Sequence, residues 1–511
     1  MGKSRKGFTL LLASLLLAGL LSGCGGKSQG DEAGSNNSNN GSGDQPTKAT
    51  LVLYGEQSKR MADFAKNEFH DKVLQAINVD VSIQYLPWTE YATGKTELML
   101  SSGEKFATYT DTAFMAKSVA KGYYADLTEA AEKYAGDLKK NTGGDEAFDI
   151  WKVNGKQYAL PFGNKPNAGE NYVIIAREDL LQEVGMTDLK TVEDVEQFYK
   201  LAKQKYPDMI GSGRGWSLNI FNGSINSNIN IYQPYSFIMT DGNKPEDPTV
   251  YSFYESDEYK QMADIARRWN KEGLIPSYAL SNPAQADSSF FAGKALFGMG
   301  ASYRVFEYMD AIRKANPNAV FKNYYLGDPA KKPLMSRGTY STAFAVGANV
   351  KGAELEGYVK LINLLQSSQE WTDFILYGVE GKDYNLTADG QIEFINQDTL
   401  FDTWLPDNIH FTRFRDYITE EQISTYQNWN EGSILQKDIG FSFNMEPVKT
   451  EYAQMQAVEQ EYIQPISQGF KDYDSNIDTA LKKLRDAGLE KFIAEYQKQF
   501  SEFISSKKAT N

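Results

Sequence analysis

The sequence predicts an α/β protein with largely parallel sheets and more than one domain. Segments with strand-like and helix-like patterns alternate from residue 49 to about residue 156, which is the order of parallel βαβ units. The chain has 511 residues. Because a single hydrophobic core rarely supports a chain of that length, we expect two or more domains. Three-layer domains of this class bind ligands at the carboxyl ends of their strands.

The first folded segments follow this alternation. Residues 50–55 are mostly apolar and end in a turn, which predicts a short buried strand. Residues 61–77 have helical periodicity, and residues 79–85 alternate apolar and polar side chains as a strand does. Near the carboxyl end, residues 476–505 predict amphipathic helices interrupted at Gly488, since glycine suits a helix C-terminus.

Three short patterns predict local devices that end or join these elements. Asn154-Gly155 between a polar and an apolar run predicts a β-hairpin turn. Gly293 permits a tight turn between a helix and a buried strand. Residues 191–194 have the form of a helix capping box, with Asp in place of the usual Glu or Gln. We expect these residues to serve the fold and assign them no binding role.

The amino terminus has the pattern of a secretion signal. Lys3, Arg5 and Lys6 precede an apolar stretch of 14 residues, 8–21, which fits a signal sequence and is shorter than the roughly 20 residues that span a bilayer. The following Leu-Ser-Gly-Cys, ending at Cys24, resembles a bacterial lipobox. We therefore expect a lipoprotein signal peptide over residues 1–23 and a lipid thioether on Cys24, with an ordinary signal peptide and an incidental cysteine as the alternative.

Composition narrows the classes of partner. The formal net charge is −14, and losing residues 1–23 removes three basic residues and no acids, which makes the secreted chain more acidic still. Such a surface argues against nucleic acid and against adhesion to anionic lipid. Residues 24–48 are mainly Gly, Ser, Asn, Gln and Asp, which predicts a disordered tether. With 1 Cys, no intramolecular disulfide can form.

The residues that catalysis or metal binding requires are scarce. His70 and His410 are the chain's 2 histidines, and neither accompanies a motif for nucleophilic catalysis. The glycine-rich residues 211–215 lack the Lys-Ser/Thr of a phosphate-binding loop, so they read as an ordinary loop. Residues 472–478 mimic part of a calcium loop but suit helix capping better, and residues 241–247 are a similar weak candidate. We expect no enzyme activity, no cofactor and no metal, although a carboxylate pair for glycoside hydrolysis stays open.

Seven stretches resemble the extracellular solute-binding proteins of ABC importers, in the carbohydrate-type family that includes maltose-binding protein. The stretches are residues 100–105, 122–128, 151–161, 176–181, 191–194, 290–300 and 378–384. Each motif alone is weakly specific, whereas their order and their position behind a lipobox are similar to the long lipoprotein branch of Gram-positive bacteria. The resemblance covers residues 49–505.

The resemblance implies a two-lobed, periplasmic-binding-protein-like (type II) fold with a hinge and a ligand cleft between the lobes. Lobe one would comprise residues 49–160 plus 339–390, and lobe two residues 161–338 plus 391–511. Family members close around a ligand and then dock on membrane permease subunits driven by an ATPase. By resemblance, we expect a monomer held by its lipid at the extracellular face of the cell membrane.

Sugars present an apolar ring face and many hydroxyl groups, so a sugar cleft needs aromatic and polar side chains. We expect ligand contacts at strand ends of lobe one, in an Asn- and aromatic-rich segment of lobe two, after the Gly300 turn, at the hinge, and at or after residues 378–381. The candidates are Tyr54, Glu56, Trp88, Asp111, Trp216, Asn219, Asn222, Tyr232, Tyr303, Arg304, Arg337, Glu380 and Trp404. For the Asn-rich segment, the alternative is a solvated insertion whose aromatic residues pack locally.

The function expected from these features is capture of an oligosaccharide for an ABC importer by hinge closure. A receptor for peptides or another polar solute is the alternative of the same architecture. A surface carbohydrate-active enzyme is the alternative from another class.

Overall fold

The structure is a computed structural model that describes residues 45–510 with internal gaps. The gaps are residues 56, 88, 91–93, 170–172, 215–216, 226–228, 232–235, 243, 245–246, 280, 335–341, 397–407, 436–437, 439–440 and 442. Residues Pro46–Asn511 form one compact unit. The signal peptide, Cys24 and nearly all of the expected tether lie outside the described residues, so those expectations stay predictions.

The first sheet has five strands, three of which come from the region where the sequence predicted alternating strands and helices. In spatial order they are β2 (Val79–Leu86), β1 (Thr47–Tyr54), β3 (Ala107–Asp111), β15 (Thr342–Val346) and β6 (Ala159–Pro161). Strand β1 runs parallel to β2 and β3, whereas β15 runs antiparallel to β3 and β6. The sheet is therefore mixed, where the sequence predicted largely parallel pairing, because β15 enters it from a distant part of the chain.

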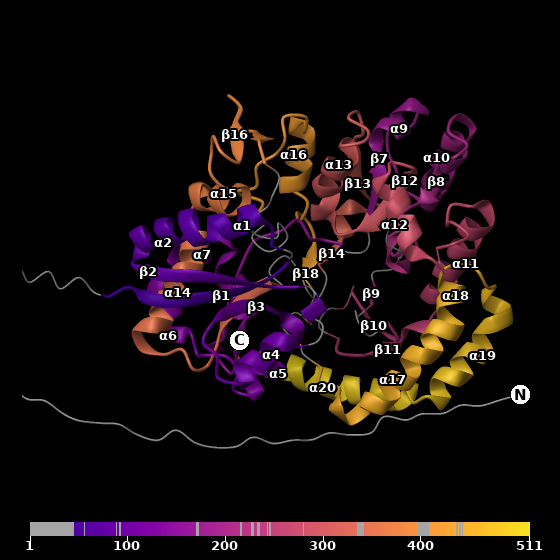
Figure 1. The fold of residues 1–511 in the computed structure, drawn as a ribbon. Coiled ribbons are helices and arrows are strands. Elements are labelled where there is room, and N and C mark those ends of the chain that lie inside the picture. Colours follow the sequence, from indigo (N-terminus) through magenta and orange to yellow (C-terminus); the bar gives the residue numbers. More distant parts are fainter. Residues whose placement is uncertain are drawn as a thin grey trace, which may run out of the picture. The chain divides into compact units, whose positions relative to one another are not determined.

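Strand β1 shows why this sheet is buried on both faces. Leu51 and Leu53 pack into one apolar cluster, and Val52 and Tyr54 pack into another on the opposite face. Because side chains alternate along a strand, a continuous apolar run fills both clusters. Figure 1 shows α2 (His70–Ile77) and α14 (Gly352–Leu365) beside β1 and β2.

The expected helix after β1 is present and contains a wider turn. Ser58 caps α1 (Lys59–Phe64), which continues through the π-helical turn η1 (Ala65–Phe69) into α2. Asn78 ends it with φ 54°. The other helices associated with this sheet are α4 (Lys95–Ser101), α5 (Thr112–Ala120), α6 (Thr128–Tyr134), α7 (Gly136–Asn141), α8 (Gly144–Asp149) and α15 (Gln369–Tyr377).

The predicted hairpin turn at Asn154-Gly155 is confirmed. It joins β4 (Lys152–Val153) to β5 (Lys156–Gln157), and the turn residues have φ values of 52° and 77°. A second small pair, β16 (Tyr384–Leu386) and β17 (Ile392–Phe394), follows α15. Ile392 belongs to the core of the first sheet, and Phe394 packs against that core. This strand pair therefore extends past residue 390, where we expected the first lobe to end.

The second sheet has four strands, in the order β13 (Phe321–Tyr325), β7 (Val173–Arg177), β12 (Ala295–Gly300) and β8 (Ile210–Ser212). Strand β12 is antiparallel to β7 and parallel to β8. The side chains of β7 also alternate between two apolar clusters. The surrounding helices are α9 (Glu178–Glu183), α10 (Val192–Lys205), α11 (Asp257–Glu272), α12 (Pro283–Phe291), α13 (Val305–Arg313) and α16 (Glu420–Gln427).

Two local devices predicted near this sheet are confirmed. The side chain of Thr191 accepts a hydrogen bond from the Asp194 backbone, and Asp194 accepts one from the Thr191 backbone, which makes the capping box that starts α10. Gly293 has φ 70° between α12 and β12, a conformation that favours glycine.

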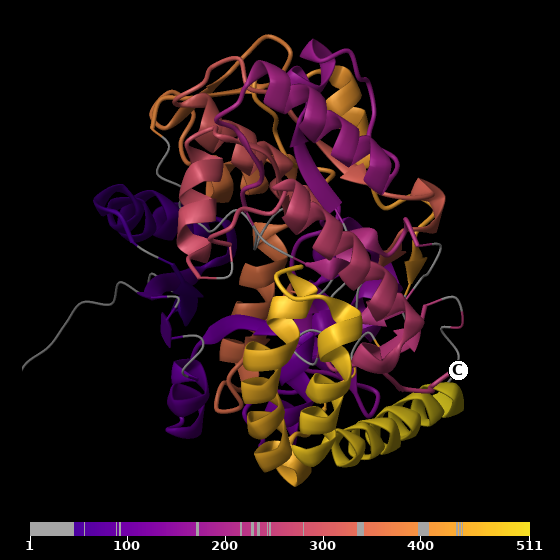
Figure 2. The same ribbon diagram turned by 90° about the vertical axis from the view of Figure 1, so that its right-hand side faces the viewer.

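The C-terminal helices pack into the core of the second sheet, beside a small third sheet. That sheet consists of β11 (Tyr251–Ser252), β10 (Ile238–Asp241) and β9 (Ile229–Ile231). The helical segments are α17 (Lys449–Val458), the π-helical turn η7 (Glu459–Ile463), α18 (Gln464–Ser467), α19 (Tyr473–Asp486) and α20 (Leu489–Thr510). Figures 1 and 2 show them in yellow tones. Asp472 caps α19 by accepting a hydrogen bond from the Ser475 backbone, which confirms the capping interpretation.

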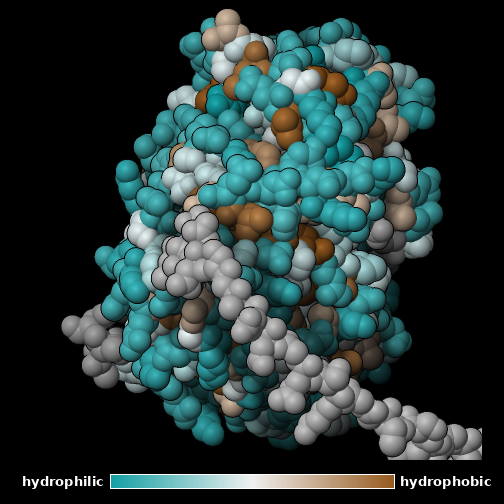
Figure 3. All heavy atoms as spheres, turned by 60° about the vertical axis from the view of Figure 1, so that its left-hand side comes forward, coloured by the Kyte–Doolittle hydropathy of each residue, from teal (hydrophilic) through white to brown (hydrophobic). Residues whose placement is uncertain are grey.

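Short elements complete the described chain. They are η2 (Leu218–Phe221), η3 (Phe253–Glu255), η4 (Ser302–Arg304), η5 (Pro329–Lys331), η6 (Glu446–Val448) and the parallel pair β14 (Pro333–Leu334) and β18 (Ile434–Leu435). On the face drawn in Figure 3, hydrophilic residues predominate and apolar residues form separate patches. Among the described residues, no helix is both long enough and apolar enough to cross a membrane.

Candidate functional site

The carboxyl ends of β1 and β3 lie at the same edge of the first sheet, because the two strands are parallel neighbours. Tyr54 is the last residue of β1 and Asp111 the last of β3, and they are 1% and 3% exposed. The Tyr54 hydroxyl donates a hydrogen bond to Thr96 Oγ1 at 2.8 Å, and burial raises the pKa of this tyrosine to about 12. As the structure stands, the Tyr54 ring is part of the core and is not open to a ligand.

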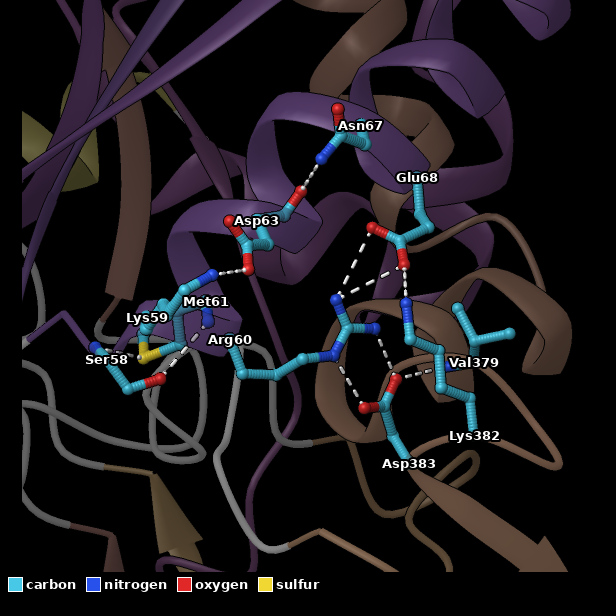
Figure 4. Close-up of polar contacts among 10 residues, drawn as sticks. All are labelled: Ser58, Lys59, Arg60, Met61, Asp63, Asn67, Glu68, Val379, Lys382 and Asp383. Atoms are coloured by element: carbon cyan, nitrogen blue, oxygen red, sulfur yellow. Dashed lines mark hydrogen bonds and ion pairs between the residues drawn. The ribbon is translucent and has the colours of Figure 1, made fainter.

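A network of charged side chains joins the start of α1 to the loop at residues 378–384. Figure 4 shows the guanidinium of Arg60 facing the Asp383 carboxylate, with Nε to Oδ1 at 2.7 Å and Nη2 to Oδ2 at 2.6 Å. Glu68 lies 3.2 Å from the same guanidinium and also accepts a hydrogen bond from Lys382. This network therefore connects two segments of the chain, and each segment lies next in sequence to an expected ligand residue, Glu56 or Glu380.

Asp383 is the centre of this network. Its side chain is 4% exposed, and it also accepts a hydrogen bond from the Val379 backbone at 2.8 Å. Burial acts to raise the pKa of Asp383, but the hydrogen bonds from Arg60 and Val379 outweigh it and hold the pKa below its ordinary value. Gly378 has φ 94°, and a Cβ atom there would lie 2.4 Å from Asp383 Oδ2. A glycine is therefore required at this position for the carboxylate to fit.

A second fixed turn lies at the end of β8, just before Trp216. The Arg214 guanidinium donates to the Tyr308 hydroxyl and to Asp287, each at 3.0 Å, and stacks over the Phe291 ring at 5.0 Å. Gly211 and Gly213 of this glycine-rich stretch have close neighbours, since added Cβ atoms would come within 2.5 Å of other residues. Part of the expected loop is therefore the strand β8, and its glycines permit close packing.

Asn219 and Asn222 lie in and directly after η2, which carries the Asn-rich segment. Both are buried, at 2% and 0% exposed. The Asn222 amide donates to the Ile229 carbonyl at 2.9 Å and accepts from the Ile229 backbone at 3.2 Å, so it closes the loop that leads to β9. The Asn219 Nδ2 is buried without a hydrogen-bond acceptor among the described residues. Asn222 is thus engaged by the backbone, whereas Asn219 keeps an unused donor.

Tyr303 and Arg304 follow β12 in η4. The Tyr303 ring lies between two cations, with Lys165 Nζ 5.2 Å and the Arg304 guanidinium carbon 5.6 Å from its centroid. Arg304 also pairs with Glu307 at 3.0 Å. Lys165 is 4% exposed and belongs to the segment that follows β6 of the first sheet. The two expected residues therefore adjoin the connection between the first and second sheets.

Residues 162–169, which follow β6, are buried and are held by side chains from a distant segment. Asn430 accepts hydrogen bonds from the backbones of Asn167 and Ala168, each at 2.9 Å, and donates to the Lys165 carbonyl at 2.7 Å. Trp429 Nε1 donates to the Ala168 carbonyl at 2.8 Å. Lys332 Nζ, just before β14, lies 4.0 Å from the centroid of the same tryptophan ring. The segment after β6 and the residue just before β14 therefore both contact Trp429, where the chain passes between the first and second sheets.

Comparison with known families identifies the class of protein. Residues 59–385 match the family described as bacterial extracellular solute-binding protein. Residues 438–505 match a domain of unknown function. The first match covers more than half of the chain. The chain belongs to the bacterial extracellular solute-binding proteins.

Individual relatives agree with this assignment. A carbohydrate ABC transporter substrate-binding protein from Streptococcus pneumoniae is 25% identical over 483 residues, which cover 91% of this chain and 93% of the relative. A crystal structure of the N-glycan transport solute-binding protein NgtS from Streptococcus pneumoniae has a TM-score of 0.74 at 22% identity, covering 90% of this chain and 100% of the other. Its complex with Man5GlcNAc has a TM-score of 0.63 at 23% identity, covering 90% and 99%. The expected family and the two-lobed α/β fold type are confirmed.

The described residues include seven of the thirteen expected ligand residues of this solute-binding protein. Tyr54 and Asp111 are buried at strand ends, and Asn222 is engaged by the backbone. Glu380 is exposed in the 378–384 loop. The candidates outside the described residues are Glu56, Trp88, Trp216, Tyr232, Arg337 and Trp404. The structure thus places Asn219, Tyr303, Arg304 and Glu380 without bringing all of them into one described cavity.

The sequence did not reveal the polar residues around the crossing, which are Lys165, Asn167, Lys332, Trp429 and Asn430. A usable signal was the polar run at residues 164–167 between two strands, where buried polar groups require partners. In the described part of the chain, no three His, Cys, Asp or Glu side chains lie where they could hold a metal ion.

Proposed function

We propose that this solute-binding protein captures an oligosaccharide outside the cell and delivers it to an ABC importer. The observation that carries the proposal is the 25% identity, over 91% of the chain, to a carbohydrate ABC transporter substrate-binding protein. Complexes of the fold relative NgtS contain Man1GlcNAc and Man5GlcNAc. Glycans of mannose and N-acetylglucosamine are therefore the first ligands to test, and permease subunits are the proposed partners.

The proposed mechanism is closure of two lobes around the ligand. The first lobe is built on the first sheet and ends near Phe394, and the second is built on the second sheet and the C-terminal helices. The segments that cross between them would be the hinge, where Asn430 holds the backbone of residues 165–168. A ligand favours closure only if it binds the closed form more tightly, and contacts from both lobes supply that difference.

Among described residues, we propose Asn219, Tyr303 and Glu380 as ligand contacts. Within the described part of the chain, Asn219 has an amide donor without an acceptor, which a sugar hydroxyl would satisfy. Tyr303 is an aromatic ring beside the crossing. Glu380 is an exposed carboxylate on a loop that Arg60 and Asp383 hold in place.

Thermal unfolding of Pro46–Asn511, the compact unit, tests the function directly. The protein is heated with Man5GlcNAc, with other oligosaccharides and with short peptides. A ligand at 100 times its dissociation constant should stabilise the protein by about 2.7 kcal/mol. Stabilisation by peptides alone would replace the proposal with a peptide receptor. Cleavage of an added glycan would favour the carbohydrate-active enzyme.

Substitution of Trp216 and Trp88 by alanine tests the expected aromatic contacts. Loss of one stacking platform should weaken glycan binding by about tenfold or more while the unliganded protein still folds. Tyr134→Ala is the control, because Tyr134 is a partly exposed aromatic residue at the end of α6, beside Lys133 and Lys360 and outside the proposed site. Unchanged affinity in either tryptophan variant removes that residue from the proposed site.

We further propose a lipid anchor on Cys24 that keeps a monomeric receptor at the extracellular face of the membrane. Support comes from the lipobox-like sequence and from the extracellular family. Cells that express the full chain should incorporate labelled palmitate into it and retain it on the membrane. Cys24→Ala should lose the label and release the protein into the medium; retention without label would contradict the anchor.

A further inference from the structure

Glu459 connects the C-terminal domain of unknown function to the third sheet. Its Oε1 atom accepts hydrogen bonds from Ser236 Oγ and from the Tyr254 hydroxyl. Ser236 lies two residues before β10, and Tyr254 lies two residues after β11. A single carboxylate oxygen on the C-terminal domain therefore holds β10 and β11 together at the end of the pair where Ile238 lies opposite Ser252.

The surroundings of Glu459 make these contacts difficult to replace. Tyr254 is 3% exposed, and burial together with the nearby Glu459 charge raises its pKa well above the ordinary value. A buried hydroxyl that loses its acceptor pays the full cost of leaving water. Glu459 is also the first residue of the π-helical turn η7. Such turns are rare and often accompany functional positions in helices.

Ring packing and a second hydrogen-bonded side chain reinforce the same attachment. Phe237, next to Ser236, is fully buried, and its ring meets those of Tyr452 and Phe492 edge to face at 6.0 Å and 5.9 Å. Gln497 of α20 accepts from the Val250 backbone at 2.7 Å and donates to the Pro248 carbonyl at 2.6 Å. Figure 1 shows α17 close to β10 and β11.

The attached segment begins at the expected ligand residues of the second lobe. Asn222 is hydrogen-bonded to Ile229, the first residue of β9, and β9 pairs with β10 through Met239 and Ile231. The path from the η2 turn through β9 to β10 is therefore continuous. We propose that the C-terminal domain braces this path through Glu459 and thereby sets glycan affinity, with Glu459 as a positioning residue that does not touch the ligand.

This inference rests on the proposed glycan function, so its test has one readout that needs no ligand. Glu459→Ala removes the acceptor, Ser236→Ala removes one donor, and Glu459→Gln keeps an oxygen that can accept both hydrogen bonds. Ser467→Ala is the matched control, because Ser467 of the same domain contacts α11, through the Tyr259 hydroxyl at 3.0 Å, although the Tyr259 ring packs against that of Tyr254. The measurements are calorimetric affinity for Man5GlcNAc and amide hydrogen exchange.

The expected result is a local effect with conservative rescue. Glu459→Ala should weaken Man5GlcNAc binding by about tenfold, Ser236→Ala by less, and the double variant by no more than Glu459→Ala alone. Glu459→Gln should recover most of the affinity, and Ser467→Ala should retain it. Hydrogen exchange should accelerate at residues 229–252 in Glu459→Ala and stay unchanged in α11.

Several outcomes would overturn the proposed role of Glu459. They are an unchanged affinity in Glu459→Ala, an equal loss in Ser467→Ala, or faster exchange spread evenly over the second lobe. If the wild-type protein binds no glycan, the proposed function fails, and the exchange pattern alone then decides whether Glu459 holds β9 and β10. If Glu459→Ala does not fold, Ser236→Ala supplies the same comparison.

Discussion

Replacing Asp383 by asparagine should destabilise the protein more than the loss of an exposed ion pair does. The substitution keeps the size of the side chain and one acceptor for the Val379 backbone. It removes the charge that faces Arg60 through two hydrogen bonds of 2.7 Å and 2.6 Å. The side chains of Arg60 and Asp383 are 12% and 4% exposed, so water replaces little of the lost interaction.

The magnitude follows from this burial. Removing one member of a buried ion pair costs about 3–5 kcal/mol, because the other charge stays out of water without its partner. Arg60 keeps Glu68 at 3.2 Å, which offsets part of that loss. We therefore expect Asp383→Asn to lower the free energy of unfolding by about 2–3 kcal/mol at pH 7.

The pH dependence has a definite sign. The folded protein lowers the pKa of Asp383, since the hydrogen bonds from Arg60 and Val379 outweigh the opposing effect of burial. The stability that this carboxylate contributes is fully present above its unfolded pKa of about 3.9 and is lost as the pH falls through the lower folded value. The difference between wild type and Asp383→Asn should therefore shrink below about pH 4.

The assay is urea unfolding followed by circular dichroism at several pH values. Lys59→Ala is the control, because Lys59 and Asp63 form an ion pair on the same helix with side chains 87% and 52% exposed. That control should change stability by less than about 0.5 kcal/mol. A loss in Asp383→Asn no larger than in the control, or one that grows towards low pH, would refute this reasoning.

Three further predictions follow from single residues. Burial lowers the pKa of Lys332 to about 8, so Lys332→Met should stabilise the protein by about 1–3 kcal/mol at pH 7, and the gain should vanish above about pH 10 in urea unfolding; destabilisation at pH 7 would contradict it. The hydrogen bond to Asp71 raises the pKa of His70, so its NMR titration midpoint should lie above about 6.5, and its stabilising effect, present below that pH, should be lost as the pH rises through the midpoint; an unshifted midpoint would oppose this. Gly378→Ala should cost more stability than Gly381→Ala, since both have positive φ but a Cβ at Gly381 meets nothing within 4 Å; equal losses would exclude a steric cause.

Local sequence patterns predicted the elements whose causes are local. The strand before Gly55, the hairpin at Asn154 and the capping box at Thr191 each depend on neighbours within a few residues, and the structure contains all three. The capping role of Asp472 was predictable for the same reason, because its hydrogen-bond partner Ser475 is close in sequence. Family resemblance supplied the two-lobed fold type.

Contacts between distant residues could not be predicted in this way. Arg60 and Asp383 are 323 positions apart, and Asn430 and Lys165 are 265 apart. Tyr54 shows the consequence at the site, since its position at a strand end indicated a ligand platform, but side chains from other segments cover its ring. The antiparallel entry of β15 into the first sheet has the same origin. Sequence patterns located the edge of the sheet, but they did not indicate which side chains at that edge are accessible to a ligand.

Calorimetric titration of Pro46–Asn511 with Man5GlcNAc tests the central claim most directly. Glycan capture predicts saturable binding of one glycan per chain, with a negative heat-capacity change as apolar surface is buried on closure. Absence of binding to this and other oligosaccharides, together with saturable binding of a peptide, would contradict glycan capture and favour a peptide receptor of the same fold.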